Sequence, residues 1–201
     1  MLRFKGRFLC LMLTVFVLLT GCSHSESADL TMQFDKEGNY TGFSNISDLS
    51  KYKSVTALRD GCYVCKDNSY SGGRQSWTAL LDNTALEQSG ACRFIQFYED
   101  DTLPSLIDIY YQNGEYHVFF SDRSNPADTG YVYTDRKVLS GIPSGLSSAV
   151  TCDVLTTNPD LTFEDLAPVL NGEDLSEETS ASFCIVLIDD MMFGWTYGQA
   201  Q

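Results

Sequence analysis

Histidine and basic residues are scarce in this 201-residue chain, and each scarcity argues against a class of function. Only two histidines occur, and His24 lies in a Ser-rich segment near the N-terminus, so His117 is the only one in the region expected to fold. The chain carries 13 Lys and Arg against 27 Asp and Glu, a formal charge of −14. Such a surface repels nucleic acid and anionic lipid headgroups. We therefore expect no nucleic-acid partner.

A long apolar run is also missing after residue 22, although a short one precedes it. Arg3, Lys5 and Arg7 are followed by mostly apolar residues over 8–19. Crossing the hydrocarbon core of a bilayer takes about 20 apolar residues, and this run is shorter. A positive segment, a short apolar segment and small residues at its end are the layout of an export signal.

The end of this apolar run, Leu19-Thr20-Gly21-Cys22, resembles the bacterial lipobox. The resemblance implies cleavage between Gly21 and Cys22 and a diacylglycerol thioether on Cys22. Two acyl chains supply the two membrane signals that stable anchoring needs. We expect residues 1–21 to be a lipoprotein signal peptide and the mature chain to be anchored on the extracytoplasmic face of a membrane. Cleavage removes three of the 13 cations and none of the 27 acids, which leaves a formal charge of −17.

The mature chain is expected to divide into a polar leader and one domain. Residues 22–53 are rich in Ser, Asp, Asn and Gly, which predicts a largely flexible tether, with a short strand at 30–34. Residues 54–201 are expected to form a single domain. Aromatic residues make up 12% of the chain and charged residues only 20%, so this region has enough apolar material for a core.

The clearest structural signal is a β-hairpin at Asn113-Gly114. Two alternating segments, 105–112 and 115–121, flank this dipeptide, which is the strongest short-range hairpin signal. A two-residue loop pairs Gln112 with Glu115. The register then gathers apolar side chains on one face: Ile107, Ile109, Tyr111, Tyr116, Val118 and Phe120. The opposite face is mixed and is expected to be half-exposed: Leu106, Asp108, Tyr110, His117, Phe119 and Ser121.

Other segments predict further strands and one main helix. The strands are expected at 62–65, 92–98, 131–138, 149–156 and 183–189. A helix is expected over 74–89, because apolar residues recur there at helical spacing and Gly90 is a suitable stop. These apolar positions are Trp77, Leu80, Leu81 and Ala85. A short helix at 163–170 lies within a polar insertion, 158–182. The expected fold is α+β, with one main helix packed on an antiparallel sheet of five or six strands.

The order of these elements resembles a domain family of lipoproteins and secreted proteins from Gram-positive bacteria. The resemblance spans roughly 58–157, and its most similar segments are Arg93–Tyr98, Ile107–Tyr111, Gly114 and Asp122–Ser124. The family is uncharacterised and has no assigned function. The resemblance therefore implies a Gram-positive source and supports the fold, and it supplies no catalytic residues.

Five cysteines remain in the region expected to fold, an odd number that leaves at least one thiol outside any internal disulfide. Cys152 and Cys184 each follow the inward alternation of their strand. They are a candidate disulfide if the two strands are neighbours, and the alternative is two buried thiols. Cys62 and Cys65 form a CxxC pair, but positions i and i+3 of a strand point to opposite faces. That geometry suits neither a disulfide nor a shared metal, so these cysteines are expected to be small buried residues.

His117 is the one candidate catalytic histidine, and its expected neighbours favour a structural role. The predicted register places His117 opposite Tyr110, with Asp108 diagonal to it, which is typical of a His–Asp pair on a sheet surface. A Cys–His or Ser–His nucleophile needs a base within hydrogen-bond reach, and no such constellation is evident. Acidic pairs such as Asp189-Asp190 are expected in solvated loops.

These observations predict a lipid-anchored module on the cell surface that binds a protein, a peptide or a small ligand. The alternatives are a cell-envelope hydrolase and a metal or redox protein built on the cysteines. We expect no catalytic residue, no metal site and no cofactor. The expected partners are the membrane, through diacylglycerol on Cys22, and an unidentified protein or small molecule.

Overall fold

The computed structural model describes residues 32–36, 40–43, 52–99, 103–121, 130–173 and 181–195. The predicted signal peptide, its cleavage site at Gly21 and Cys22 lie outside these residues, so the lipid anchor stays a prediction. Among the helices of the described segments, none combines the length and the apolar character that a membrane span requires.

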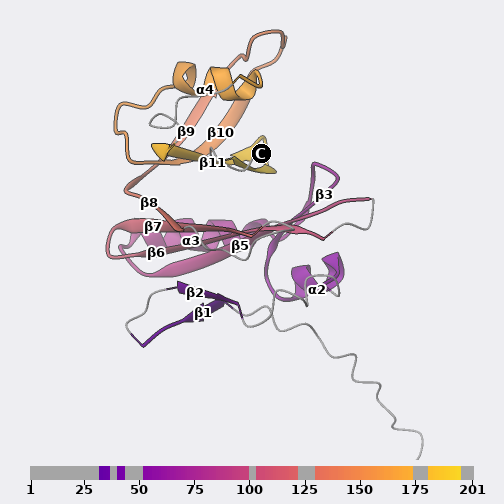
Figure 1. Ribbon diagram of the computed structural model, residues 1–201, viewed down its shortest axis with the longest axis vertical. Helices are drawn as coiled ribbons and strands as arrows, with labels where there is room; N and C mark the ends of the chain where they lie inside the picture. The colour runs from indigo at the N-terminus through magenta and orange to yellow at the C-terminus, as the bar shows by residue number, and fades with distance from the viewer. Residues whose placement is uncertain are drawn as a thin grey trace, which may run out of the picture.

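A mixed six-stranded sheet lies at the centre of the fold (Figure 1). In spatial order its strands are β4 (Ser69–Gly72), β3 (Tyr63–Lys66), β5 (Gly90–Phe97), β6 (Ser105–Gln112), β7 (Glu115–Ser121) and β8 (Gly130–Tyr133). Strands β3 and β5 run parallel, and the chain between them contains the helix α3 (Arg74–Ala85). The other neighbours in this sheet are antiparallel.

A second sheet has four antiparallel strands. In spatial order they are β12 (Met191–Trp195), β11 (Phe183–Ile188), β10 (Val150–Thr156) and β9 (Asp135–Gly141). The fold is α+β as expected, but the single antiparallel sheet is wrong. Only Thr134 separates β8 from β9, so the one strand predicted at 131–138 is two strands that belong to different sheets.

The layers are stacked so that both faces of the central sheet are covered. The four-stranded sheet and α3 pack on one face, and α2 (Ser54–Arg59) packs on the other. Helix α4 (Phe163–Leu170), at the position predicted, covers the outer face of the four-stranded sheet. Figure 1 shows the stack from α4 at the top, through the two sheets, to α2 at the bottom.

Part of the segment expected to be a tether is ordered as a hairpin. Strands β1 (Met32–Phe34) and β2 (Tyr40–Phe43) pair antiparallel, and β1 overlaps the short strand predicted at 30–34. This hairpin lies on the side of the central sheet that faces away from the four-stranded sheet (Figure 1). The predicted start of the domain at residue 54 coincides with the start of α2, and Tyr52 just before it is already buried.

Helix α3 is shorter than predicted because its stop signal lies before Gly90. The helix ends at Ala85, and Glu87 takes the left-handed conformation at φ 54° that we assigned to glycine. Gly90 is instead the first residue of β5. Trp77 and Leu80 are buried as the apolar stripe predicted, whereas Ala85 is exposed.

The β6–β7 hairpin has the predicted register, with Gln112 opposite Glu115 and Ile109 opposite Val118. Its apolar face lies in the core between the two sheets. The opposite face is more buried than predicted, since Asp108 is 2% and Tyr110 6% exposed. The physical reason is that this face also has a covering layer, so it is not the half-solvated face of a simple sheet.

A buried ion pair crosses this second face. Arg93 on β5 lies directly opposite Asp108 on β6. The guanidinium donates from Nε to Oδ1 and from Nη2 to Oδ2, each at 2.6 Å, and the two side chains are 5% and 2% exposed. Such a bidentate pair keeps both charges satisfied where water does not reach them.

The five cysteines of the described fold are buried thiols and none is in a disulfide: Cys62, Cys65, Cys92, Cys152 and Cys184. The candidate disulfide between Cys152 and Cys184 is not formed, and the alternative of two buried thiols describes this pair. Cys184 lies opposite Leu155, three residues along β10 from Cys152, so the two side chains lie on opposite faces of the sheet. Cys152 belongs to the cluster under α4, and Cys184 belongs to the core between the sheets. Cys62 and Cys65 lie in different clusters on the two faces of the central sheet, as strand geometry predicts.

We expect these five thiols to react with iodoacetamide only after the protein unfolds. Burial raises the pKa of Cys92 to about 12 and that of Cys152 to about 11, and the thiolate is the reactive form. Peptide masses after labelling at pH 8, with and without urea and without reductant, measure this. Labelling of the native protein would contradict the burial of these thiols, and protection of Cys152 and Cys184 in urea would show that they form a disulfide.

Candidate functional site

A cleft of about 460 Å³ opens between α3 and the inner face of the four-stranded sheet. We call it the α3 cleft. Helix α3 supplies one wall, with Arg74, Trp77, Thr78 and Leu81 at positions i, i+3, i+4 and i+7 of a single helical stripe. The same stripe that packs Trp77 into the core therefore continues into the cleft with Thr78 and Leu81.

Alternation along two strands supplies the opposite wall. Arg136 and Val138 on β9, and Thr151 and Asp153 on β10, point to the inner face of the four-stranded sheet. Val138 lies directly opposite Asp153 in the register, and Arg136 is the diagonal neighbour of Asp153. Diagonal neighbours in a sheet are within reach of a long side chain, so Arg136 extends along the wall to this carboxylate.

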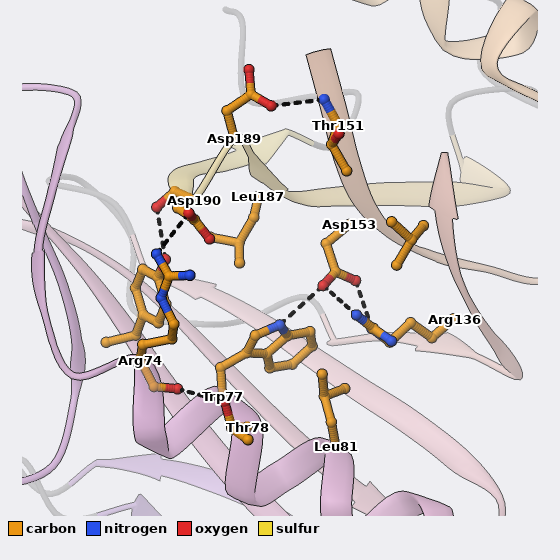
Figure 2. Close-up of a pocket in the computed structure, with 12 residues that line it drawn as sticks. Arg74, Trp77, Thr78, Leu81, Arg136, Thr151, Asp153, Leu187, Asp189 and Asp190 are labelled. Atoms are coloured by element: carbon orange, nitrogen blue, oxygen red, sulfur yellow. Dashed lines mark hydrogen bonds and ion pairs between the residues drawn. The ribbon is translucent and has the colours of Figure 1, made fainter. Parts of the chain in front are cut away.

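Asp153 joins the two walls of the α3 cleft. Arg136 donates from Nε to Oδ1 at 2.7 Å and from Nη2 to Oδ2 at 2.6 Å. Trp77 Nε1 donates to Oδ2 at 3.0 Å. The Arg136 guanidinium also lies 5.6 Å from the centre of the Trp77 ring, a distance that allows a cation–π contact. Figure 2 shows the three side chains converging between helix and sheet. These contacts set the separation of the two walls.

The far end of the cleft is formed by the two-residue turn between β11 and β12. Asp190 accepts a hydrogen bond from Arg74 Nη2 at 2.6 Å, and its backbone oxygen accepts one from the Tyr63 hydroxyl at 2.7 Å. Burial raises the pKa of Tyr63, with the nearby Asp190 carboxylate acting in the same direction. The phenol therefore stays protonated and holds the turn against β3.

Asp189 fixes the same turn from the other side. Its carboxylate accepts a hydrogen bond from the Thr151 backbone N–H at 2.8 Å, and Asp189 N donates to Thr151 O at 2.9 Å. Both turn residues have positive φ, 46° for Asp189 and 70° for Asp190. Two left-handed residues in succession are what a type I′ two-residue hairpin loop requires, and aspartate tolerates this conformation better than most side chains.

The electrostatic balance of the α3 cleft is close to neutral. Two arginines and three aspartates line it, and four of these five charges form two ion pairs. The pairs differ in exposure. Arg136 and Asp153 are 27% and 13% exposed, whereas Arg74 and Asp190 are 52% and 48% exposed. The cleft therefore has one fixed pair and one pair that water reaches freely.

His117 lies outside the α3 cleft. It is on β7, opposite Tyr110 as predicted, and the two rings are stacked with centres 4.5 Å apart. The predicted His–Asp pair is wrong, because Asp108 binds Arg93, and His117 instead lies beside Glu115, with Nε2 3.8 Å from Oε2. The structure thus gives His117 a packing role on the face of the sheet away from the cleft.

The stacked position of His117 predicts a pH-dependent stability. Burial lowers the pKa of His117 from 6.5, and Glu115 opposes this only in part. Because the folded state binds the proton less tightly than the unfolded chain, the wild type loses stability as the pH falls below about 6.5. His117→Phe keeps a stacked ring without a titrating group. Urea unfolding at pH 8 and at pH 5 measures the free energy of unfolding of both proteins. Between these pH values the wild type should lose more of it than His117→Phe. An equal or smaller loss in the wild type would contradict the assignment.

The sequence singled out only part of this site. Trp77 and Leu81 were expected to pack as a helical stripe, and Asp189 and Asp190 were expected in a solvated loop. Arg74, Arg136 and Asp153 were not predicted to have a role. The available signal was the polar character of alternate residues in 149–156, but it could be interpreted only once a facing helix was known.

Among the described residues, no three His, Cys, Asp or Glu side chains gather into a group that could hold a metal ion.

Comparisons with family models, with curated proteins and with solved structures find no match to this chain. The resemblance to a Gram-positive lipoprotein family therefore stays a prediction from the sequence.

Proposed function

We propose that this protein is a lipid-anchored extracytoplasmic module that binds a small ligand in the α3 cleft. The observation that carries the proposal is the Trp77–Asp153–Arg136 network, which holds two walls from distant parts of the chain at a fixed separation. Sites for small molecules typically measure about 300–1,000 Å³ and place a few polar groups among apolar ones. The α3 cleft has that size and that mixture.

Binding fits this cleft better than the alternative of a hydrolase centred on His117. That histidine lies on the face of the central sheet that points away from the cleft. Within the cleft both oxygens of Asp153 accept hydrogen bonds from Arg136 and Trp77, so this carboxylate orients other groups. An array of oriented donors and acceptors around an open volume is suited to recognition.

A thermal unfolding screen tests the proposal. The probes are small neutral, cationic, anionic and zwitterionic compounds, because a bound ligand raises the unfolding free energy by about 2.7 kcal/mol at 100 times its Kd. We expect at least one class to raise the Tm of the wild type and of Asp67→Asn, a change in a turn outside the cleft. Asp153→Asn should lose the response. No response in the wild type, or an equal response in Asp153→Asn, would contradict binding in this cleft.

The lipid anchor is tested separately. Cells supplied with an alkyne-bearing fatty acid should label the wild-type protein and not the Cys22→Ser variant, and the N-terminal peptide of the mature protein should begin at residue 22 with added acyl mass. A mature N-terminus upstream of Cys22, or an unmodified thiol there, would contradict the anchored location.

A further inference from the structure

The Arg74–Asp190 pair is the part of the α3 cleft that a ligand can open. It has a single hydrogen bond, from Nη2 to Oδ2, and about half of each side chain is exposed. Exposed ion pairs contribute little to stability, so exchanging this partner costs little. The Arg136–Asp153 pair is bidentate, less exposed and bound to Trp77, so it stays closed.

The charges at this pair restrict what can replace it. A simple anion would bind Arg74 and leave the Asp190 carboxylate without its cation. A simple cation would bind Asp190 and leave the Arg74 guanidinium without its anion. An anion also meets the long-range repulsion of a mature chain with a formal charge of −17. A zwitterion satisfies both side chains at once and leaves the net charge of the cleft unchanged.

Beyond this pair the lining of the cleft includes apolar side chains beside the Arg136–Asp153 pair. Leu81 lies seven positions after Arg74 along α3, about 10 Å at 1.5 Å per residue. Figure 2 shows Arg74 and Asp190 at one end and Leu81 at the other. On the opposite wall Val138 is 54% exposed, an apolar side chain open to a ligand. A ligand held at Arg74 therefore finds apolar contacts several ångströms away.

From these features we propose that the α3 cleft binds a free α-amino acid with a large apolar side chain. The α-carboxylate binds the Arg74 guanidinium, the α-ammonium binds the Asp190 carboxylate, and the side chain extends toward Leu81 and Val138. A bidentate contact between carboxylate and guanidinium is geometrically matched. The assignment rests on the proposed binding function and specifies its ligand class.

Calorimetric titration of the purified mature protein with L-phenylalanine tests the assignment. N-acetyl-L-phenylalanine lacks the ammonium group, L-phenylalanine amide lacks the carboxylate, and glycine lacks the side chain. We expect each of these three to bind at least about tenfold more weakly than L-phenylalanine, because each loses charged hydrogen bonds or apolar contacts. Equal affinity for either blocked derivative would overturn the zwitterion.

Substitutions inside and outside the cleft test where L-phenylalanine binds. Arg74→Gln and Asp190→Asn should each weaken binding of L-phenylalanine by at least about tenfold. Arg59→Gln removes a similarly exposed arginine from the Arg59–Asp60 pair on α2, outside the cleft, and should leave the affinity unchanged. Wild-type affinity in Arg74→Gln would overturn the assignment.

If L-phenylalanine fails to bind while another probe raises the Tm of the wild type and not that of Asp153→Asn, the ligand class is wrong and the binding function stands. If no probe acts, both fail.

Discussion

Replacement of Asp108 by alanine is expected to lower the free energy of unfolding by about 3–5 kcal/mol, the usual cost of breaking a buried ion pair from one side. The substitution leaves the Arg93 charge in a position that is 5% exposed and removes the carboxylate that neutralises it. Two charged hydrogen bonds of 2.6 Å are lost together. Urea unfolding of the wild type and Asp108→Ala, followed by circular dichroism, measures the change.

A double substitution separates the buried charge from the loss of packing. Arg93→Met with Asp108→Leu removes both charges and keeps apolar volume on the two strands. Replacing a buried pair by apolar residues is often neutral or stabilising, so the double variant should be clearly more stable than Asp108→Ala. A loss below about 1 kcal/mol in Asp108→Ala would contradict the burial of this pair.

Gly73→Ala is expected to destabilise the fold by at least about 3 kcal/mol. Gly73 has a φ of 84°, a conformation that costs other residues about 1–2 kcal/mol. A Cβ at this position would also lie 1.8 Å from the Cys62 backbone oxygen, and no side-chain rotation relieves a clash with backbone. Because Gly73 precedes the first residue of α3, the strain would move the helix that forms one wall of the cleft.

Gly61→Ala is the matched control for this substitution. Gly61 has nearly the same φ, 82°, and nothing lies within 4 Å of a Cβ built there. It should therefore show only the conformational cost of about 1–2 kcal/mol. Thermal unfolding of both variants measures the difference, and equal losses would contradict the close approach of Gly73 to β3.

Local signals predicted the parts of the fold that depend on neighbouring residues. Asn113-Gly114 and the alternation on either side were sufficient for the register of β6 and β7. The short α4 was also predicted where it occurs, and its Thr162 and Asp165 form a reciprocal capping interaction. In these cases the turn chemistry and the apolar pattern agree within a few residues.

Long-range packing decided what the sequence did not predict. One continuous strand was expected over 131–138, and nothing local shows that Thr134 marks the passage from one sheet to another. Asp108 was expected to be exposed because it is polar. It is buried because distant segments of the chain cover its face of the sheet, which its own segment does not reveal. Strand β4 was missed because its sequence, Ser-Tyr-Ser-Gly, is typical of a turn.

The candidate site was hidden for the same reason. Its residues come from α3, two strands of the second sheet and the turn after β11, and each residue has an ordinary explanation in its own segment. In its own segment Asp153 is only a polar residue of an alternating strand. Its role becomes visible when the fold places Trp77 and Arg136 beside it. No motif at fixed spacing connects them.

The most direct test of ligand binding in the α3 cleft follows the indole N–H of Trp77, which donates to Asp153. The chain has two tryptophans, so the ¹⁵N spectrum contains two indole signals, and Trp77→Phe identifies the relevant one. We predict that small probes, and L-phenylalanine among them, shift the Trp77 signal in a saturable manner and that Asp153→Asn abolishes the response. If no probe shifts the Trp77 signal at concentrations up to its solubility limit, the result would contradict a binding site in this cleft.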